Sequence, residues 1–201
     1  MFDAHAHIGI ATDNALVNTT SGEEARNAKG FKYLAAGLLY PNSDLKLYEE
    51  LLKRGLYSGE IGIDKRFPQK DKQIKVFKDA LSIAKSYDRL ITIHAVGYID
   101  ELLKCIDEIK PKKFIVHGFT GSFETAQEIT KRGGFISLSP RALKAKSFKE
   151  LLTLPFLVES DMITGKEEME ALSSLIKTID QHVSFNTEER TEKLIRELLD
   201  V

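Results

Sequence analysis

The chain has 201 residues, of which 42% are hydrophobic and 29% are charged, and its formal net charge is −1. This balance is typical of one globular domain and excludes a disordered chain, while the charge excludes a strongly basic protein that coats nucleic acids. The single cysteine, Cys105, excludes an intrachain disulfide and a cysteine-rich zinc module. No apolar run reaches the roughly 18 residues of a membrane span, and the first residues carry no signal-peptide pattern. We therefore expect a cytoplasmic protein with no membrane contact and no obligate protein partner.

Eight short runs of β-branched and other apolar residues are the predicted strands of a single domain over residues 1–201. Several are continuously apolar, which is typical of strands covered on both faces. The weakest is Ala15–Asn18, and the pattern is least regular over residues 8–32. In chain order the predicted strands are Phe2–His7, Ala15–Asn18, Tyr33–Leu39, Tyr57–Ile63, Leu90–His94, Lys113–His117, Phe135–Leu138 and Phe156–Glu159.

Longer segments between these runs carry apolar residues at three- and four-residue spacing, which predicts helices. The clearest apolar stripes begin at Ile74, Ile99 and Met169, and a last helix is predicted over Thr187–Leu199. Eight strands alternating with helices predict a (β/α)8 TIM barrel, compact with short loops because about 200 residues is near the minimum for this fold. An open, doubly wound sheet is the alternative. In both folds ligands bind at the carboxyl ends of the strands.

Residues that can bind metal ions gather at those strand ends. Histidines i and i+2 point to the same face of a strand, so a His-x-His pair can reach one ion. Imidazole suits zinc, and carboxylates also accept Mg²⁺ or Mn²⁺. Four histidines and two acids suffice for two divalent ions that share a bridging carboxylate. The six residues are His5 and His7 at the end of the first strand, Glu60 in the fourth, His94 and His117 ending the fifth and sixth, and Asp161 after the eighth.

Each of these residues also has an ordinary structural interpretation when it is taken alone. His94 is then a hydrogen-bonded core histidine, Glu60 the partner of a lysine, and Asp161 a helix N-cap. Their joint placement at strand ends favours a metal site. His182 serves as a contrast, because it lies near a predicted helix end and is interpreted as structural or exposed.

The order of these motifs along the chain resembles the TatD family of metal-dependent hydrolases, which belongs to the amidohydrolase superfamily of (β/α)8 barrels. The resemblance extends from Phe2 to about Asp161. It is carried by His5-Ala6-His7, Gly59-Glu60-Ile61-Gly62-Ile63-Asp64, the strand ending in His94, His117-Gly118-Phe119-Thr120-Gly121 and Glu159-Ser160-Asp161.

The resemblance implies a division of the six residues between two divalent ions, Zn²⁺, Mg²⁺ or Mn²⁺. His5, His7 and Asp161 would hold the first ion, His94 and His117 the second, and Glu60 would bridge both. Asp161 and Glu60 would be the catalytic residues, with Asp161 as the general base for a metal-activated water. The implied activity is phosphodiester cleavage by a deoxyribonuclease, with DNA or a small phosphoester as the substrate.

The residues that would contact the substrate differ from the family pattern. The family shows His-x-Arg after the fifth strand where this chain has Val96, and Gly-x-His-Pro after the third strand where it has Tyr40. An arginine binds phosphate well through its planar fork. Lys65 and Arg66 are the candidates to replace it, and Arg141, at the end of the seventh strand, is a third candidate phosphate contact.

Other functions fit the same motifs. The loss of arginine at Val96 is compatible with a hydrolase of a small-molecule ester, amide or phosphoester on the same barrel. A non-catalytic metal-binding relative is a further alternative. A barrel of the polymerase-and-histidinol-phosphatase type also begins with His-x-His, but the stretches around Glu60 and His117 do not follow its pattern.

Overall fold

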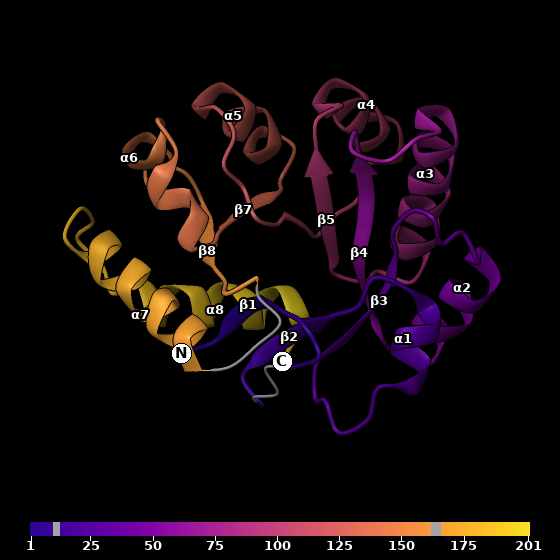
Figure 1. Ribbon diagram of the computed structural model, residues 1–201, viewed down its shortest axis with the longest axis horizontal. Coiled ribbons are helices and arrows are strands. Elements are labelled where there is room, and N and C mark those ends of the chain that lie inside the picture. Colours follow the sequence, from indigo (N-terminus) through magenta and orange to yellow (C-terminus); the bar gives the residue numbers. More distant parts are fainter. Residues whose placement is uncertain (10–12, 162–165) are drawn as a thin grey trace.

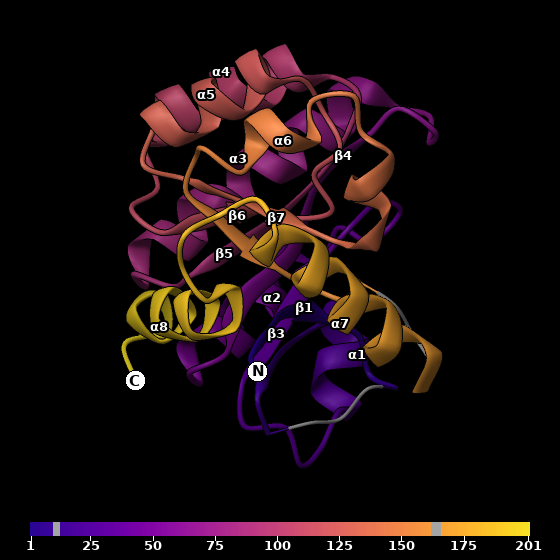
Figure 2. The same cartoon turned by 90° about the vertical axis from the view of Figure 1, so that its left-hand side faces the viewer.

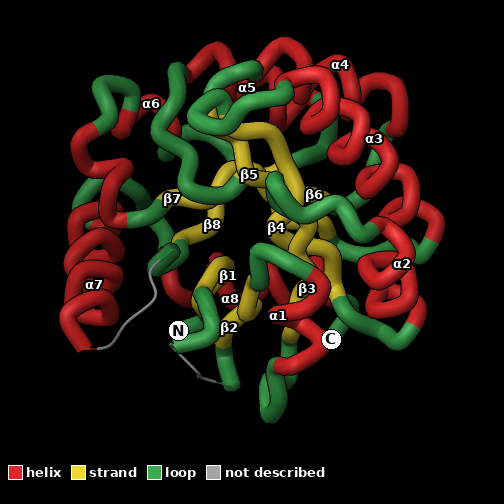
Figure 3. The backbone as a smooth tube through the Cα atoms, turned by 45° about the vertical axis from the view of Figure 1, so that its right-hand side comes forward, coloured by secondary structure: helices red, strands yellow, loops and turns green. Residues whose placement is uncertain are grey.

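Eight parallel strands follow one another around a nearly closed barrel in the computed structural model, which describes residues 1–9, 13–161 and 166–201 (Figure 1). Each strand pairs with the next along the chain, which confirms the (β/α)8 barrel and excludes the doubly wound sheet. Figure 3 shows the strands at the centre and the helices outside them. The strands are β1 (Asp3–Ala6), β2 (Ala15–Asn18), β3 (Leu34–Leu38), β4 (Tyr57–Asp64), β5 (Ile91–Val96), β6 (Phe114–Val116), β7 (Phe135–Leu138) and β8 (Phe156–Val158).

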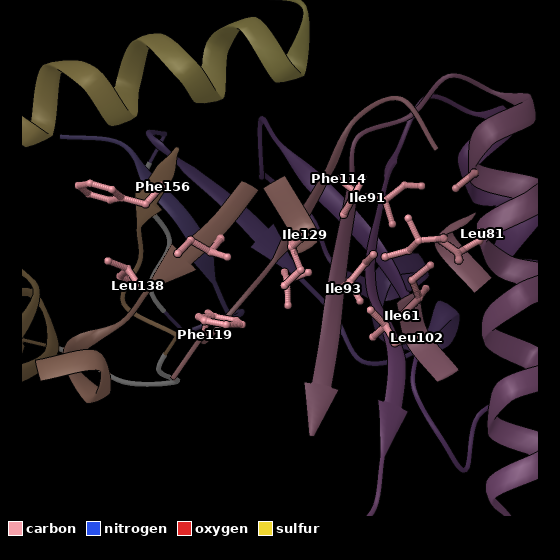
Figure 4. Packing of buried hydrophobic residues seen from close by; sticks show 14 of the residues in the cluster. Ile61, Leu81, Ile91, Ile93, Leu102, Phe114, Phe119, Ile129, Leu138 and Phe156 are labelled. Carbon is pink, nitrogen blue, oxygen red and sulfur yellow. The ribbon is translucent and has the colours of Figure 1, made fainter. Parts of the chain in front are cut away.

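The helices pack on the barrel through the predicted apolar stripes. Phe77 and Leu81, for example, are buried against the strands, and Figure 4 shows Leu81 close to Ile91 and Ile93. Within the described parts of the chain no helix has both the length and the apolar character that crossing a membrane requires. The helices are α1 (Gly22–Asn27), α2 (Leu45–Lys53), α3 (Lys70–Ser86), α4 (Ile99–Ile109), α5 (Phe123–Lys131), the 3-10 helix η1 (Pro140–Lys144), α6 (Phe148–Leu151), α7 (Lys166–Asp180) and α8 (Thr187–Leu199).

The region expected to be least regular, residues 8–32, contains a strand and a short helix. β2 has the predicted bounds and all four of its residues are buried. The pattern did not reveal α1, which has only six residues and begins where the Ser21 side chain accepts a hydrogen bond from the Glu24 N–H. Residues 10–12 lie outside the described part of the chain.

A separate apolar cluster occupies the interior of the barrel. It joins Phe2, Leu16 and Leu157 of the strand region to Ile195 and Leu199 of α8. Figure 2 shows α7 and α8 on the same side of the molecule, and α8 contacts β8 and β1. The buried polar residues that could bind an ion, Glu60, His117 and Glu159 among them, lie instead at or near the carboxyl ends of the strands.

Hydrogen bonds bridge the seam between β8 and β1, where the ladder of strand pairings ends. The Asp161 N–H donates to the His5 carbonyl at 3.0 Å. The buried Asp3 carboxylate accepts from the Ser160 N–H at 3.0 Å and from the His5 N–H at 3.2 Å. The seam thus brings His5 and Asp161 side by side.

Candidate metal centre

The structure brings all six predicted metal ligands together at the carboxyl end of the barrel. His5, Glu60 and His94 belong to β1, β4 and β5, and His7 follows β1 closely. His117 directly follows β6, and Asp161 comes three residues after the end of β8. Parallel strands end at the same rim of the barrel, so positions far apart in the sequence meet there.

Three of these residues lie at the seam and are called the seam group here: His5, His7 and Asp161. Asp161 Oδ1 is 3.8 Å from His5 Nε2 and 3.8 Å from His7 Nε2. One ligand atom from each residue can be chosen so that all lie within 4.8 Å of one another, a spacing that fits one metal ion.

The other three residues lie on adjacent, paired strands or at their ends and are called the ladder group: Glu60, His94 and His117. Glu60 Oε1 is 2.6 Å from His117 Nε2 and 3.4 Å from His94 Nδ1, and the two ring nitrogens are 3.1 Å apart. Glu60 Oε1 is also 3.7 Å from His5 Nε2. The Glu60 carboxylate therefore faces both groups, as a bridging ligand must.

The chemistry of the donor set fits a divalent cation. His5 is fully buried, and within the described chain neither of its ring nitrogens has a hydrogen-bond partner. Burial lowers the pKa of His5 well below its usual value, so this imidazole is neutral and offers a lone pair. Burying a neutral imidazole that has no hydrogen-bond partner costs folding free energy. A cation bound to its lone pair would offset that cost.

His117 and Glu60 form a close, buried ion pair in the site. Burial acts to lower the pKa of His117, but the Glu60 and Glu159 carboxylates outweigh it and raise that pKa to about 10. Burial acts to raise the pKa of Glu60, and His117 outweighs it and holds that pKa well below its usual value. Metal binding here must displace the His117 proton, so we expect it to weaken as the pH falls.

Two buried carboxylates behind the ladder group were not identified from the sequence. Glu159 Oε1 accepts from the Gly118 N–H at 2.6 Å and lies 3.7 Å from His117 Nδ1. Asp64 Oδ2 lies 3.2 Å from His94 Nε2. Both residues stand inside motifs that carry the resemblance, and Asp64 comes four positions after Glu60, on the same strand face.

The three predicted substrate-binding residues line one cavity of about 450 Å³ next to the ladder group. Lys65 is exposed at its edge, Arg66 is hydrogen-bonded to Asp64, and the Arg141 guanidinium contacts the Asp161 carboxylate. The apolar part of the wall includes Val96, Ile99 and Phe119, and the polar part includes His94, His117, Thr120 and Thr125.

The two departures from the family pattern also lie at this rim. Val96, where the family has arginine, forms part of the cavity wall. Tyr40 packs against Phe67 with the ring centroids 5.9 Å apart. His182, the contrast residue, is exposed at the end of α7, where its Nδ1 lies 2.9 Å from the Thr178 carbonyl oxygen.

Two curated relatives share part of the sequence. The uncharacterized metal-dependent hydrolase MJ1582 of Methanocaldococcus jannaschii is 34% identical over 112 residues, which cover 53% of this chain and 43% of that protein. The uncharacterized metal-dependent hydrolase YjjV of Escherichia coli is 30% identical over 143 residues, which cover 64% of this chain and 55% of that protein. The matches thus span about half the length of these relatives.

Solved structures share the barrel. The crystal structure of the Escherichia coli TatD homologue YjjV superposes with a TM-score of 0.76 at 22% identity, covering 93% of this chain and 86% of the other. A TatD family hydrolase from Entamoeba histolytica gives a TM-score of 0.71 at 14% identity, with 92% and 83% covered. The family model described as TatD related DNase matches residues 42–195, a range that holds four of the six predicted ligands. The chain therefore belongs to the TatD family.

Proposed function

We propose that the protein is a metal-dependent hydrolase that cleaves phosphodiester bonds in single-stranded DNA. The observation that carries this proposal is the convergence of four histidines and two carboxylates, three of the six buried, beside a cavity bordered by cationic side chains. Membership of a family described as TatD related DNase, and two relatives named metal-dependent hydrolases, support the reaction class.

The seam group and the ladder group would each hold one divalent ion, with Glu60 shared between them. Zn²⁺, Mn²⁺ and Mg²⁺ all suit mixed imidazole and carboxylate ligands. When bound, such ions supply a water of lowered pKa and stabilise the negative charge that develops on the phosphate oxygens. The neutral imidazole of His5 and the low pKa of the Glu60 carboxyl prepare both side chains for this role.

Asp161 is the proposed general base. Its Oδ1 lies 3.8 Å from His5 Nε2 and 3.7 Å from His117 Nδ1, and its other oxygen faces Arg141. The carboxylate can thus hold a proton taken from the attacking water at the centre of the site. A general base of this kind contributes roughly 10²- to 10⁴-fold to a rate.

Cationic residues beside the cavity support an anionic substrate. Lys65, Arg66 and Arg141 line the cavity. Residues 140–149, which begin beside Arg141, contain four basic residues and no acidic residue, in a chain whose net charge is −1. We propose that Lys65, Arg66 and Arg141 bind phosphates of the substrate and that the basic segment attracts the rest of the polyanion.

One observation favours a second candidate function, the hydrolysis of a small phosphoester. Val96 and Ile99 give the cavity an apolar wall next to His94, and a volume of about 450 Å³ is the size of a small-molecule pocket. A small ester with one apolar group fits such a wall without any contact to a polynucleotide backbone.

The deciding experiment measures cleavage of end-labelled single-stranded DNA by protein loaded with Mg²⁺, Mn²⁺ or Zn²⁺. We expect cleavage that a chelator stops and that Asp161→Asn slows by about 10²- to 10⁴-fold. Asp107→Asn is the matched control, because Asp107 is an exposed carboxylate that pairs with Arg132 at 2.7 Å, on the helical layer. Metal-loaded protein that hydrolyses bis(p-nitrophenyl) phosphate but no DNA would favour the small phosphoester. Normal cleavage by Asp161→Asn would contradict the assignment of the base.

A further inference from the structure

Asp64 touches the side of the His94 ring that faces away from Glu60. Asp64 Oδ2 is 3.2 Å from His94 Nε2, while His94 Nδ1 is 3.4 Å from Glu60 Oε1. A ring proton on Nε2 would donate to Asp64, the nearer of the two carboxylates, and would leave the Nδ1 lone pair facing Glu60 and His117. We infer that Asp64 is a positioning residue that presents His94 Nδ1 to the metal of the ladder group, an inference that rests on the proposed function.

Arg66 fixes the Asp64 carboxylate from the other side. The Arg66 backbone N–H donates to Asp64 Oδ1 at 2.8 Å, and the guanidinium Nε donates at 2.9 Å to each carboxylate oxygen. These bonds keep Asp64 ionised and set the plane of its carboxylate. The carboxylate is nearly buried while the Arg66 side chain is 63% exposed, so one guanidinium orients Asp64 and also borders the substrate cavity.

Gln73 of α3 holds the backbone on which this arrangement is built. The Asp64 N–H donates to Gln73 Oε1 at 2.9 Å, and Gln73 Nε2 donates to the carbonyls of Asp64, Phe67 and Pro68 at 3.2, 3.1 and 2.9 Å. Gln73 is 3% exposed. The buried Gln73 amide therefore forms hydrogen bonds with backbone groups at both ends of the turn that carries Arg66. These bonds fix the position of the Asp64 backbone.

His5 of the seam group has no such carboxylate partner in the described chain, since neither of its ring nitrogens has a hydrogen-bond partner. Carboxylates behind a metal-binding histidine fix its tautomer and raise its basicity, and their loss weakens metal binding about 10- to 100-fold. We therefore expect Asp64 to act selectively on the ion of the ladder group.

Zinc binding, measured by chelator competition without any substrate, tests this inference. In Asp64→Asn we expect the ladder ion to bind about 10- to 100-fold more weakly and the seam ion to bind as in the wild type. Arg66→Gln keeps the carboxylate but loses its clamp, and we expect a loss of several-fold. Asp79→Asn is the matched control and should change nothing, because Asp79 lies on the exposed face of α3, paired with Lys75.

Nitrogen-15 NMR of the zinc-loaded wild type gives a readout that needs no variant. We expect the His94 ring proton on Nε2 and the metal on Nδ1. A proton on Nδ1, no zinc at His94, or unchanged zinc affinity in both Asp64→Asn and Arg66→Gln would overturn the inference. If Asp64→Asn fails to fold, the zinc affinity of Arg66→Gln and the spectrum of the wild type still test the inference. Zinc binding as expected without any hydrolysis would count against the proposed function alone.

Discussion

The seam group and the ladder group share the Glu60 carboxylate but are held in different ways. The ladder group lies on or beside paired strands, in which Gly62 is the register partner of His94 and Ile93 that of Val116, and the register of β4 against β5 shifts between Ser58 and Ile61, around Glu60. The seam group depends on a few hydrogen bonds across the gap between β8 and β1, which the Ser160 N–H makes to Asp3 and the Asp161 N–H to the His5 carbonyl. Strand pairing thus holds the ladder group, while a few local hydrogen bonds hold the seam group, so we expect substitutions to affect the two groups differently.

The largest expected effect comes from Asp161→Asn, which acts on the seam group. Loss of the proposed base should lower the rate of DNA cleavage by about 10²- to 10⁴-fold, while the ladder group, which lacks Asp161, keeps its ion. The rate with saturating metal and the number of ions bound per chain measure both halves of this prediction. Loss of both ions in the variant would show that the seam group and the ladder group do not bind their ions independently.

The next largest effect concerns the seam itself and depends on pH. Burial raises the pKa of Asp3 to about 6. A carboxyl whose pKa is higher in the folded than in the unfolded chain binds more protons when folded, so this group makes stability fall as the pH rises from about 4 to 6. Relative to Asp3→Asn, whose side-chain oxygen can still accept the same N–H groups, the metal-free wild type should lose about 3 kcal/mol of unfolding free energy across this range.

Urea unfolding of metal-free wild type and Asp3→Asn at pH 4 and pH 7 measures this difference. Asp107→Asn is again the control, because its exposed carboxylate should give no comparable pH dependence. An equal change with pH in the wild type and in Asp3→Asn would mean that the Asp3 carboxyl titrates alike in the folded and unfolded chains.

Part of this arrangement can be predicted from the sequence alone. The strands and their order are predictable because each apolar run is bounded by turns, and the histidines and acids at the strand ends follow from that order. The short helices α1 and α6 are not, because four to six residues are too few to show a helical period. The roles of Asp64 and Glu159 depend on which ring nitrogen each carboxylate approaches, and spacing along a chain does not specify this.

A smaller effect should follow when the missing arginine is restored beside the ladder group. Val96 lies in the cavity wall, and Val96→Arg would add a guanidinium that can form two charge-assisted hydrogen bonds with a phosphate. We expect kcat/KM for single-stranded DNA to rise about tenfold, which corresponds to about 1.4 kcal/mol. Val96→Leu controls for size and should give no increase. An equal response of both variants would mean that this wall does not contact phosphate.

The smallest effect is expected for Ser122→Ala, which separates two roles of the turn between His117 and α5. The Ser122 hydroxyl accepts the Thr125 N–H at 3.2 Å, as an N-cap does. Loss of this cap should reduce the unfolding free energy by about 1 kcal/mol. If Ser122 is only a cap, kcat/KM for DNA should stay within about twofold, because the N–H groups of the turn remain. A rise in KM of tenfold or more with unchanged kcat would instead make the turn part of the phosphate-binding surface, directly next to His117 of the ladder group.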